Sequence, residues 1–297
     1  MRMAVIGIGS NSVRLLVADH AEGEWGIVHR GRSGTRLFAG LEDGALGAQS
    51  MAQTCQAAAE MAEYARQMGV QALFSFATSA VRDATNRDAF CDMLQAHTGV
   101  PLEVCSGEEE AQLSYCGAAH PGLCGLIDIG GGSTEWVHGL DGVPLRAVSL
   151  QMGGVRLHRC IPIHTAADLL RAQSKAESVL QEGLASFTDC PTPSQWVGVG
   201  GIFTSLAAID KQLASFDRSL VEGHVLTKTR VAHLGEALAD MTVAERCKLP
   251  GLHPQRADIV VHGIAILLAC MALWGLETIT VSDHGNLDGY LRRRVAQ

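Results

Sequence analysis

The chain has 297 residues, 47% of them hydrophobic, which suggests about two folded domains and excludes a disordered protein. Its formal net charge of −8 disfavours a broad surface for nucleic acid or for an anionic membrane, because such surfaces are basic. A small polyanion in a local pocket stays compatible with this charge.

The first part of the chain alternates short apolar runs with helical patterns. Residues 4–9 predict a strand that ends in a glycine turn, and residues 13–18 resume strand character, so the two predict a β-hairpin. Helices are predicted over residues 49–68 and 86–97, and strands over residues 73–77 and 102–105. Ser106 is predicted to cap a following helix that has acidic residues in its first turn.

The second part of the chain begins with another predicted hairpin. Residues 126–129 and 135–137 predict two strands that flank a glycine turn. A helix is predicted over residues 166–184, and a strand that ends in paired glycines over residues 196–201. Strands that alternate with helices predict an α/β fold.

Residues 259–276 form the most apolar stretch of the sequence. We expect a buried helix there rather than a membrane span, because His262 interrupts the stretch and acidic residues bound it. The nine cysteines include no Cys-x-x-Cys pair and the N-terminus does not resemble a signal peptide, so we expect a cytoplasmic protein. The cysteines expected in the core are Cys55, Cys91, Cys105, Cys124 and Cys270.

The two predicted hairpins share one plan. Residues 7–12 read Gly-Ile-Gly-Ser-Asn-Ser, and residues 128–133, which lie 121 positions later, read Asp-Ile-Gly-Gly-Gly-Ser. Each segment runs from a strand through a glycine turn to hydroxyl residues and then into another strand. This weak internal repeat predicts two duplicated lobes that face one cleft.

Both glycine turns are suited to binding phosphate. Consecutive glycines let backbone N–H groups converge on an anion, and neighbouring hydroxyls add donors. One such loop is typical of an ordinary tight turn, but two matched loops favour a phosphate held from both sides. No P-loop sequence is present, since no Lys follows a Gly. The candidate phosphate-binding residues are Gly9, Ser10, Asn11, Ser12, Gly130, Gly131, Gly132, Ser133, Thr134, Gly200 and Gly201.

Acidic residues flank the second glycine turn, where they could bind a metal ion beside a phosphate. Asp128 ends a strand directly before the glycines, and Glu135 follows the loop, so both could hold Mg²⁺ beside phosphate oxygens. The same placement is typical of a turn cap and of an exposed strand residue. Of Glu108, Glu109 and Glu110, at least two are expected to be solvated at the helix start, and one could point into the cleft as a general base for water.

Arg82 follows a predicted strand in a turn of small residues. It is a candidate phosphate ligand, or simply a partner of Asp83. The twelve histidines show no metal-binding spacing, and no Gly-x-Ser-x-Gly nucleophile elbow is present.

Several short motifs together resemble one family. They lie at residues 8–12, 77–84, 106–111, 127–135, 149–153, 197–201, 249–252 and 256–258. On these motifs, above all residues 128–135 with the upstream Gly-Glu-Glu-Glu-Ala, the chain resembles the exopolyphosphatase/guanosine pentaphosphate phosphatase family of the actin–hexokinase–Hsp70 superfamily.

The resemblance implies two lobes of ribonuclease-H-like topology with an interlobe cleft. It implies hydrolysis of a terminal phosphoanhydride in polyphosphate or guanosine pentaphosphate, with Mg²⁺ or another divalent cation. By the same resemblance Glu110 is the general base, Asp128 and Glu135 organise metal and water, and Arg82 is one of the phosphate-binding residues. A homodimer is expected on the resemblance alone.

Two positions depart from the family pattern. Gly7 stands where the family has Asp in its first loop, which removes one carboxylate from the predicted metal site. Residues 286–289 read Asn-Leu-Asp-Gly where the family has Leu-Arg-Glu-Gly, so an Arg is lost. These departures favour an alternative, a catalytically weak sensor of the same ligand. A sugar kinase of the same superfamily fits less well, because Glu110 suits the activation of water.

We therefore predict a Mg²⁺-dependent phosphohydrolase that acts on polyphosphate or a guanosine polyphosphate and has neither nucleic acid nor membrane as a partner. The N-terminal actin-like lobe is expected over residues 1–120 and the C-terminal lobe over residues 121–283. Residues 284–297 are expected to pack back on the first lobe.

Overall fold

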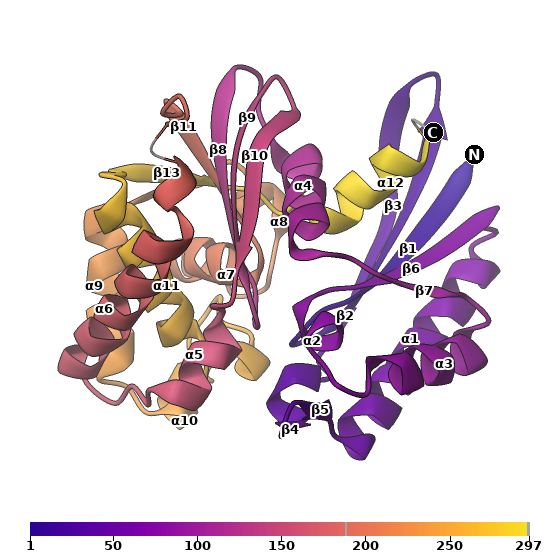
Figure 1. Cartoon of the computed structure of the whole chain (residues 1–297), viewed down its shortest axis with the longest axis horizontal. Helices are drawn as coiled ribbons and strands as arrows, with labels where there is room; N and C mark the ends of the chain where they lie inside the picture. The colour runs from indigo at the N-terminus through magenta and orange to yellow at the C-terminus, as the bar shows by residue number, and fades with distance from the viewer. Residues whose placement is uncertain (188, 296–297) are drawn as a thin grey trace.

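Strands and helices alternate along the chain and form two large sheets of the same design, one in each lobe, beside a small two-stranded sheet (Figure 1). The computed structural model describes residues 1–187 and 189–295. The strands are β1 (Arg2–Ile8), β2 (Val13–Ala21), β3 (Glu24–Ser33), β4 (Leu41–Glu42), β5 (Ala45–Leu46), β6 (Ala72–Ala77), β7 (Leu102–Val104), β8 (Leu123–Ile129), β9 (Thr134–Leu140), β10 (Val143–Leu150), β11 (Gln195–Val199), β12 (Val225–Thr227) and β13 (Thr278–Val281).

Helices cover the two sheets and fill the space between them. The α-helices are α1 (Ala48–Gln67), α2 (Ser79–Arg82), α3 (Arg87–Thr98), α4 (Gly107–Ala118), α5 (Gly154–Cys160), α6 (Ala166–Gly183), α7 (Gly201–Asp210), α8 (Arg218–Val221), α9 (Lys228–Ala239), α10 (Val243–Arg246), α11 (Val260–Leu273) and α12 (Asn286–Val295). Three short 3₁₀ helices are η1 (Leu37–Gly40), η2 (Ala185–Phe187) and η3 (Pro254–Arg256).

The two sheets repeat one strand order. The first runs β3-β2-β1-β6-β7 and the second β10-β9-β8-β11-β13-β12. In each sheet an antiparallel meander of three strands is continued by parallel strands, since β1 pairs antiparallel with β2 and parallel with β6, as β8 does with β9 and β11. The second sheet has one more strand, β12, which pairs antiparallel with β13. The predicted α/β fold with two duplicated lobes is therefore confirmed.

Helices α4 and α12 cross each other between the sheets (Figure 1). The crossing is in backbone contact, because a Cβ atom added at Gly289 would lie 1.9 Å from the Leu113 O atom, and one at Gly117 would lie 1.9 Å from the Gly285 O atom. Helix α4 packs on β8 and β9, whereas α12 packs on β1. The predicted lobe boundaries stay predictions.

The apolar stretch predicted as a buried helix is α11, which lies in the core of the second lobe. Among the described residues, no helix has the length and apolar character to cross a bilayer. All nine cysteines are free thiols, and of the five expected in the core only Cys91 is half-buried rather than buried.

Candidate functional site

The two glycine turns fold in the same way. The β1–β2 loop is closed by a hydrogen bond of 3.0 Å from Gly9 N to Ser12 O, and the β8–β9 loop by one of 3.0 Å from Gly130 N to Ser133 O. The repeat in the sequence is therefore a repeat of turn geometry as well.

Both turns direct their carbonyl groups into the protein. Ser10 O accepts a hydrogen bond from Phe38 N, and Gly131 O accepts one from Val155 N. The N–H groups of Ser10, Asn11 and Gly131 donate no hydrogen bond to any described residue. They are consequently available to an anion, as the small-residue sequence of these loops predicts.

The turns of the two lobes touch each other at the bottom of the cleft. A Cβ atom at Gly131 would lie 2.9 Å from Ser10 Cβ, and one at Gly132 would lie 2.6 Å from Ser79 Oγ. Ser10 Oγ and Ser79 Oγ are themselves hydrogen-bonded at 3.0 Å. Only glycine permits this approach, so these residues bring the loops of the two lobes together around one site.

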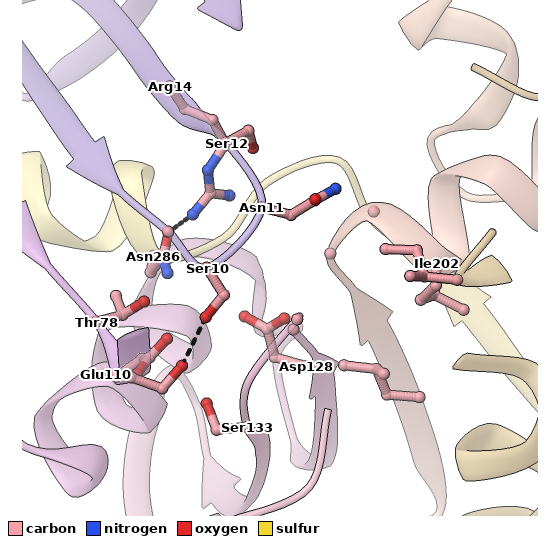
Figure 2. Close-up of a pocket in the computed structure, with 18 of the residues that line it drawn as sticks. Ser10, Asn11, Ser12, Arg14, Thr78, Glu110, Asp128, Ser133, Ile202 and Asn286 are labelled. Carbon is pink, nitrogen blue, oxygen red and sulfur yellow. Dashed lines mark hydrogen bonds between the residues drawn. The ribbon is translucent and has the colours of Figure 1, made fainter. Parts of the chain in front are cut away.

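A cavity of about 100 Å³, which we call the inner pocket, lies between the two turns (Figure 2). Most of the predicted site residues line it: Gly9, Ser10, Asn11, Ser12, Glu110, Asp128, Gly130, Gly131, Ser133, Gly200 and Gly201. Arg82, Gly132, Thr134 and Glu135 are not part of its wall.

Glu110 is the acidic residue of the α4 N-terminus that faces the inner pocket. It is buried, whereas Glu108 and Glu109 are exposed, and Glu109 completes a capping box with Ser106, the predicted N-cap. Arg82 Nη1 donates to Glu110 Oε2 at 2.9 Å. Burial raises the pKa of Glu110 to about 7, against the opposing effect of Arg82. A carboxylate of this kind exchanges its proton near neutral pH, as a general base must.

Asp128 and Glu135 lie directly opposite each other on β8 and β9, so their side chains share one face of the sheet. Ser114 Oγ donates to Asp128 Oδ2 at 2.7 Å, and Ser149 Oγ donates to Glu135 Oε1 at 2.8 Å. Burial raises the pKa of both carboxyl groups, and the charges of Glu110 and Asp128 raise that of Glu135 further. Buried carboxylates that repel each other require protons or a cation.

These carboxylates fit a divalent cation. The Oε2 atom of Glu135 is buried and has no hydrogen-bond partner among the described residues, and carboxylate oxygens are the ligands that Mg²⁺ prefers. Within residues 1–187 and 189–295, no three His, Cys, Asp or Glu side chains are gathered as a ready metal cage. The protein would thus supply one or two ligands from Asp128 and Glu135, and water and phosphate oxygens would complete the shell.

Three arginines line the cleft as well, namely Arg14, Arg32 and Arg256. Arg14 Nη2 donates to Asn286 Oδ1 at 3.0 Å (Figure 2), and Arg256 Nη1 donates to Gly201 O at 2.7 Å. In the described part of the chain, none of the three forms an ion pair with a carboxylate.

The lowered pKa values of these arginines indicate a site for an anion. Burial lowers the pKa of all three, and the charges of Arg32 and Arg14 lower that of Arg256 further, to about 9. The charges of Asp128 and Glu110 act in the opposite direction on Arg14. Desolvated guanidinium groups that form no ion pair favour a multiply charged anion between them.

None of the three arginines belongs to the motifs that predict the site from the sequence, apart from Arg256 in residues 256–258, which carries no predicted role. The internal repeat does indicate Arg14, because the separation of 121 positions between the two hairpins places Arg14 at the position that corresponds to Glu135.

Arg82 and Thr134 contact protein groups rather than the inner pocket. Arg82 pairs with Glu110, and Thr134 Oγ1 donates to Met152 O at 2.5 Å. The role of Arg82 as a phosphate ligand stays a prediction.

Gly7, the first departure from the family pattern, lies outside the wall of the inner pocket. A Cβ atom at Gly7 would lie 3.1 Å from Leu287 Cδ1, so the two departures contact each other. In the β1–β2 register Gly7 lies directly opposite Arg14. With Gly7 at this position, Arg14 has no carboxylate directly opposite it on the neighbouring strand.

Sequence comparisons agree with this arrangement. The model of the Ppx/GppA phosphatase family matches residues 16–296. Exopolyphosphatase 2 of Mycobacterium tuberculosis is 34% identical over 312 residues, which cover 97% of both chains. The guanosine-5′-triphosphate,3′-diphosphate pyrophosphatase of Vibrio atlanticus is 31% identical over 96% of this chain and 58% of its own length.

Solved structures show the same fold over the whole chain. The Aquifex aeolicus PPX-GPPA enzyme superposes with a TM-score of 0.82 at 28% identity, over 98% of both chains. An exopolyphosphatase from Cytophaga hutchinsonii shares the fold with a TM-score of 0.91 at 24% identity, over 100% of this chain and 98% of that one. The match over nearly all of the chain, in sequence and in fold, shows that the protein belongs to the Ppx/GppA phosphatase family.

Proposed function

We propose that the protein is a divalent-cation-dependent phosphohydrolase that releases the terminal phosphate from polyphosphate or from a guanosine polyphosphate. The observation that carries this proposal is Glu110, a buried carboxylate with a pKa raised to about 7 that faces the inner pocket. The names of the relatives, an exopolyphosphatase and a guanosine polyphosphate pyrophosphatase, support the same class of reaction. A cytoplasmic location and a homodimer stay predictions.

In the proposed reaction the two glycine turns hold the terminal phosphoryl group. The free N–H groups of Ser10, Asn11 and Gly131 donate to its oxygens, and so stabilise the charge that develops during transfer. A cation at Asp128 and Glu135 would add positive charge beside the same oxygens.

Glu110 accepts a proton from the attacking water and directs the water oxygen to phosphorus. The pairing with Arg82 fixes the orientation of the Glu110 carboxylate. The bond between phosphorus and the bridging oxygen breaks, and the shortened chain leaves with the bridging oxygen. Arg14 and Arg256 are placed to hold this leaving chain, because both line the inner pocket without an acidic partner.

Release of orthophosphate tests the proposal. Wild-type protein is incubated with polyphosphate and with guanosine pentaphosphate, once with Mg²⁺ and once with EDTA. We expect release from at least one substrate with Mg²⁺ and its loss in EDTA. Binding of both compounds without any release would contradict the proposal and support the sensor alternative.

A further inference from the structure

A larger cavity, the outer chamber, opens from the inner pocket. Its volume is about 940 Å³, and it shares Arg14, Asp128 and Arg256 with the wall of the inner pocket. The two cavities are therefore one continuous cleft, with the catalytic carboxylates at its narrow end. A substrate cleaved in the inner pocket must place its remaining part in the outer chamber.

Free positive charge is concentrated at the inner end of this cleft. Arg14, Arg32 and Arg256 line both cavities and pair with no carboxylate among the described residues. The part of the substrate next to the scissile bond thus meets three guanidinium groups. That is the environment expected for the phosphates of a short, highly charged segment.

Further out, the positive charges are largely neutralised. Arg30 pairs with Asp288, and Arg218 Nε pairs with Asp283 Oδ2 at 2.5 Å. Lys248 also lines the outer chamber, but it is exposed to solvent. An extended polyphosphate carries a charge on every unit, and beyond its first units it would find few free cations here.

The outer chamber instead offers an apolar wall. Leu213 and Phe216 come from the loop between α7 and α8, and Leu249 and Leu252 come from the segment between α10 and η3. Leu213 and Leu249 pack against the core of the second lobe, and Leu252 is buried within it. Phe216 is 54% exposed, so one aromatic side chain stands open beside the cavity.

Both segments of this wall are fixed to the end of α7. Leu213 N donates to Ala208 O at 3.0 Å, and Gly251, with φ +84°, approaches so closely that a Cβ atom there would lie 2.4 Å from Ala208 C and O. A side chain at Gly251 would separate the two segments. The wall is consequently a preformed part of the site rather than two independent loops.

We propose that the outer chamber binds the nucleoside of a nucleoside polyphosphate, with the base stacked on Phe216, and that Phe216 sets a preference for nucleotides over linear polyphosphate. A nucleobase is planar and uncharged, which suits the apolar wall, while the attached phosphates reach the three free arginines. The inference rests on the proposed function, since it assigns the substrate class of the same site.

The test compares two substrates in one set of variants. Stacking of a base on an aromatic ring contributes enough that Phe216→Ala should raise the KM for guanosine pentaphosphate about tenfold, with the KM for long-chain polyphosphate changed less than about twofold. Phe216→Trp should restore the wild-type KM. Leu220→Ala is the matched control, because Leu220 is a 46% exposed apolar residue of α8 outside the chamber wall.

Several results would overturn the inference while leaving the proposed function intact: release from polyphosphate alone, equal KM changes for both substrates, or no change for either. If the wild-type protein releases phosphate from neither compound, the proposed function fails instead. The dissociation constants of the same variants, measured by calorimetry, then still decide the inference. A tenfold weaker binding of guanosine pentaphosphate alone by Phe216→Ala supports it, and equal binding by all variants contradicts it.

Discussion

Arg14 and Glu135 occupy equivalent positions in the two repeats, yet they carry opposite charges. Each follows its glycine turn, and the residue directly opposite on the neighbouring strand is Gly7 in the first sheet and Asp128 in the second. At this pair of positions the first lobe therefore presents a guanidinium group with no carboxylate opposite it, and the second presents two carboxylates. One side of the cleft suits an anion and the other suits a cation.

This asymmetry predicts the effect of Gly7→Asp. A carboxylate at this position lies opposite Arg14 and neutralises it, and Leu287 Cδ1 needs to shift only slightly to admit the added Cβ atom. Because a charge-assisted contact with phosphate is lost, we expect the KM for the phosphate substrate to rise about tenfold. Steady-state kinetics of phosphate release measures the change.

Gly26→Asp is the matched control, because Gly26 lies on β3 with no atom near its Cβ position and the variant adds the same charge. It should leave KM unchanged. The sequence alone suggests the opposite role for Gly7, that of a lost metal ligand. A lower Mg²⁺ requirement with an unchanged KM in Gly7→Asp would therefore show that the structural interpretation of Gly7 is mistaken.

At the scale of elements, the crossing of α4 and α12 joins the two lobes. The helices meet at Gly117 and Gly289 in backbone contact. Any larger side chain must push the helices apart, since the atoms it meets are backbone carbonyls rather than flexible side chains. We expect Gly289→Ala to lower the free energy of unfolding by about 2 kcal/mol, as overpacking commonly does.

Chemical denaturation of Gly289→Ala and Gly285→Ala tests the crossing. Gly285 precedes α12 and has no atom within 4 Å of its Cβ position, so its replacement should be nearly neutral. Equal stability of the two variants would mean that α12 is not held closely against α4.

The sequence predicts the elements whose signals are local. The two hairpins, the glycine turns and the buried helix α11 follow from apolar runs and small residues, and the structure has all of them. The strands β3 and β10 were missed, because both are edge strands with many half-exposed or exposed residues and little alternation. Arg32 lies on β3, so this part of the site was missed together with its strand.

The rest of the site depends on contacts distant in sequence. Arg14 meets Asn286, and Arg82 meets Glu110, only after the sheets and crossing helices have formed. Composition and periodicity do not show which of the three consecutive glutamates points inward, and only the family resemblance indicates Glu110. The structure selects Glu110 because Glu109 is occupied by the cap at Ser106.

For the whole molecule, arginines of α5 connect the two lobes below the cleft. Arg156 Nη2 pairs with Asp83 Oδ2 at 2.7 Å, and Arg159 Nη2 donates to Leu41 O at 2.8 Å. These contacts hold the second lobe against η1 and α2 of the first. The cleft therefore lies between lobes that are joined both by α5 and by the crossing helices.

The buried carboxyl groups predict how the stability of the whole protein depends on pH. The pKa of Glu110 in the folded protein is about 7, above the ordinary carboxyl value, so the folded protein binds more protons than the unfolded chain and loses stability as pH rises through 7. The buried His138 and His262, with pKa values lowered to about 4, have the opposite effect up to about pH 7.5, because histidines of the unfolded chain are still half protonated at about pH 6.5.

We therefore expect the melting temperature of the metal-free wild type to fall by about 2 °C between about pH 6.5 and pH 8 relative to that of Glu110→Gln, in which the same histidines titrate. Differential scanning fluorimetry over this interval measures it. Glu110→Gln serves as the reference, since its side chain at this position does not titrate. Addition of Mg²⁺ with orthophosphate should oppose the decrease by supplying a counter-charge. A wild-type melting temperature that does not fall relative to that of Glu110→Gln would contradict the burial of an ionisable carboxyl group at this position.

The central claim, that Glu110 activates water in the inner pocket, is tested most directly by the rate of phosphate release from Glu110→Gln beside Glu108→Gln. Glu108 is the exposed neighbour and serves as the control. We expect Glu110→Gln to lower kcat about 100-fold or more while circular dichroism stays unchanged, and Glu108→Gln to keep the wild-type rate. In the wild type, kcat should rise with pH through about 7. A Glu110→Gln rate within about threefold of wild type would contradict the account.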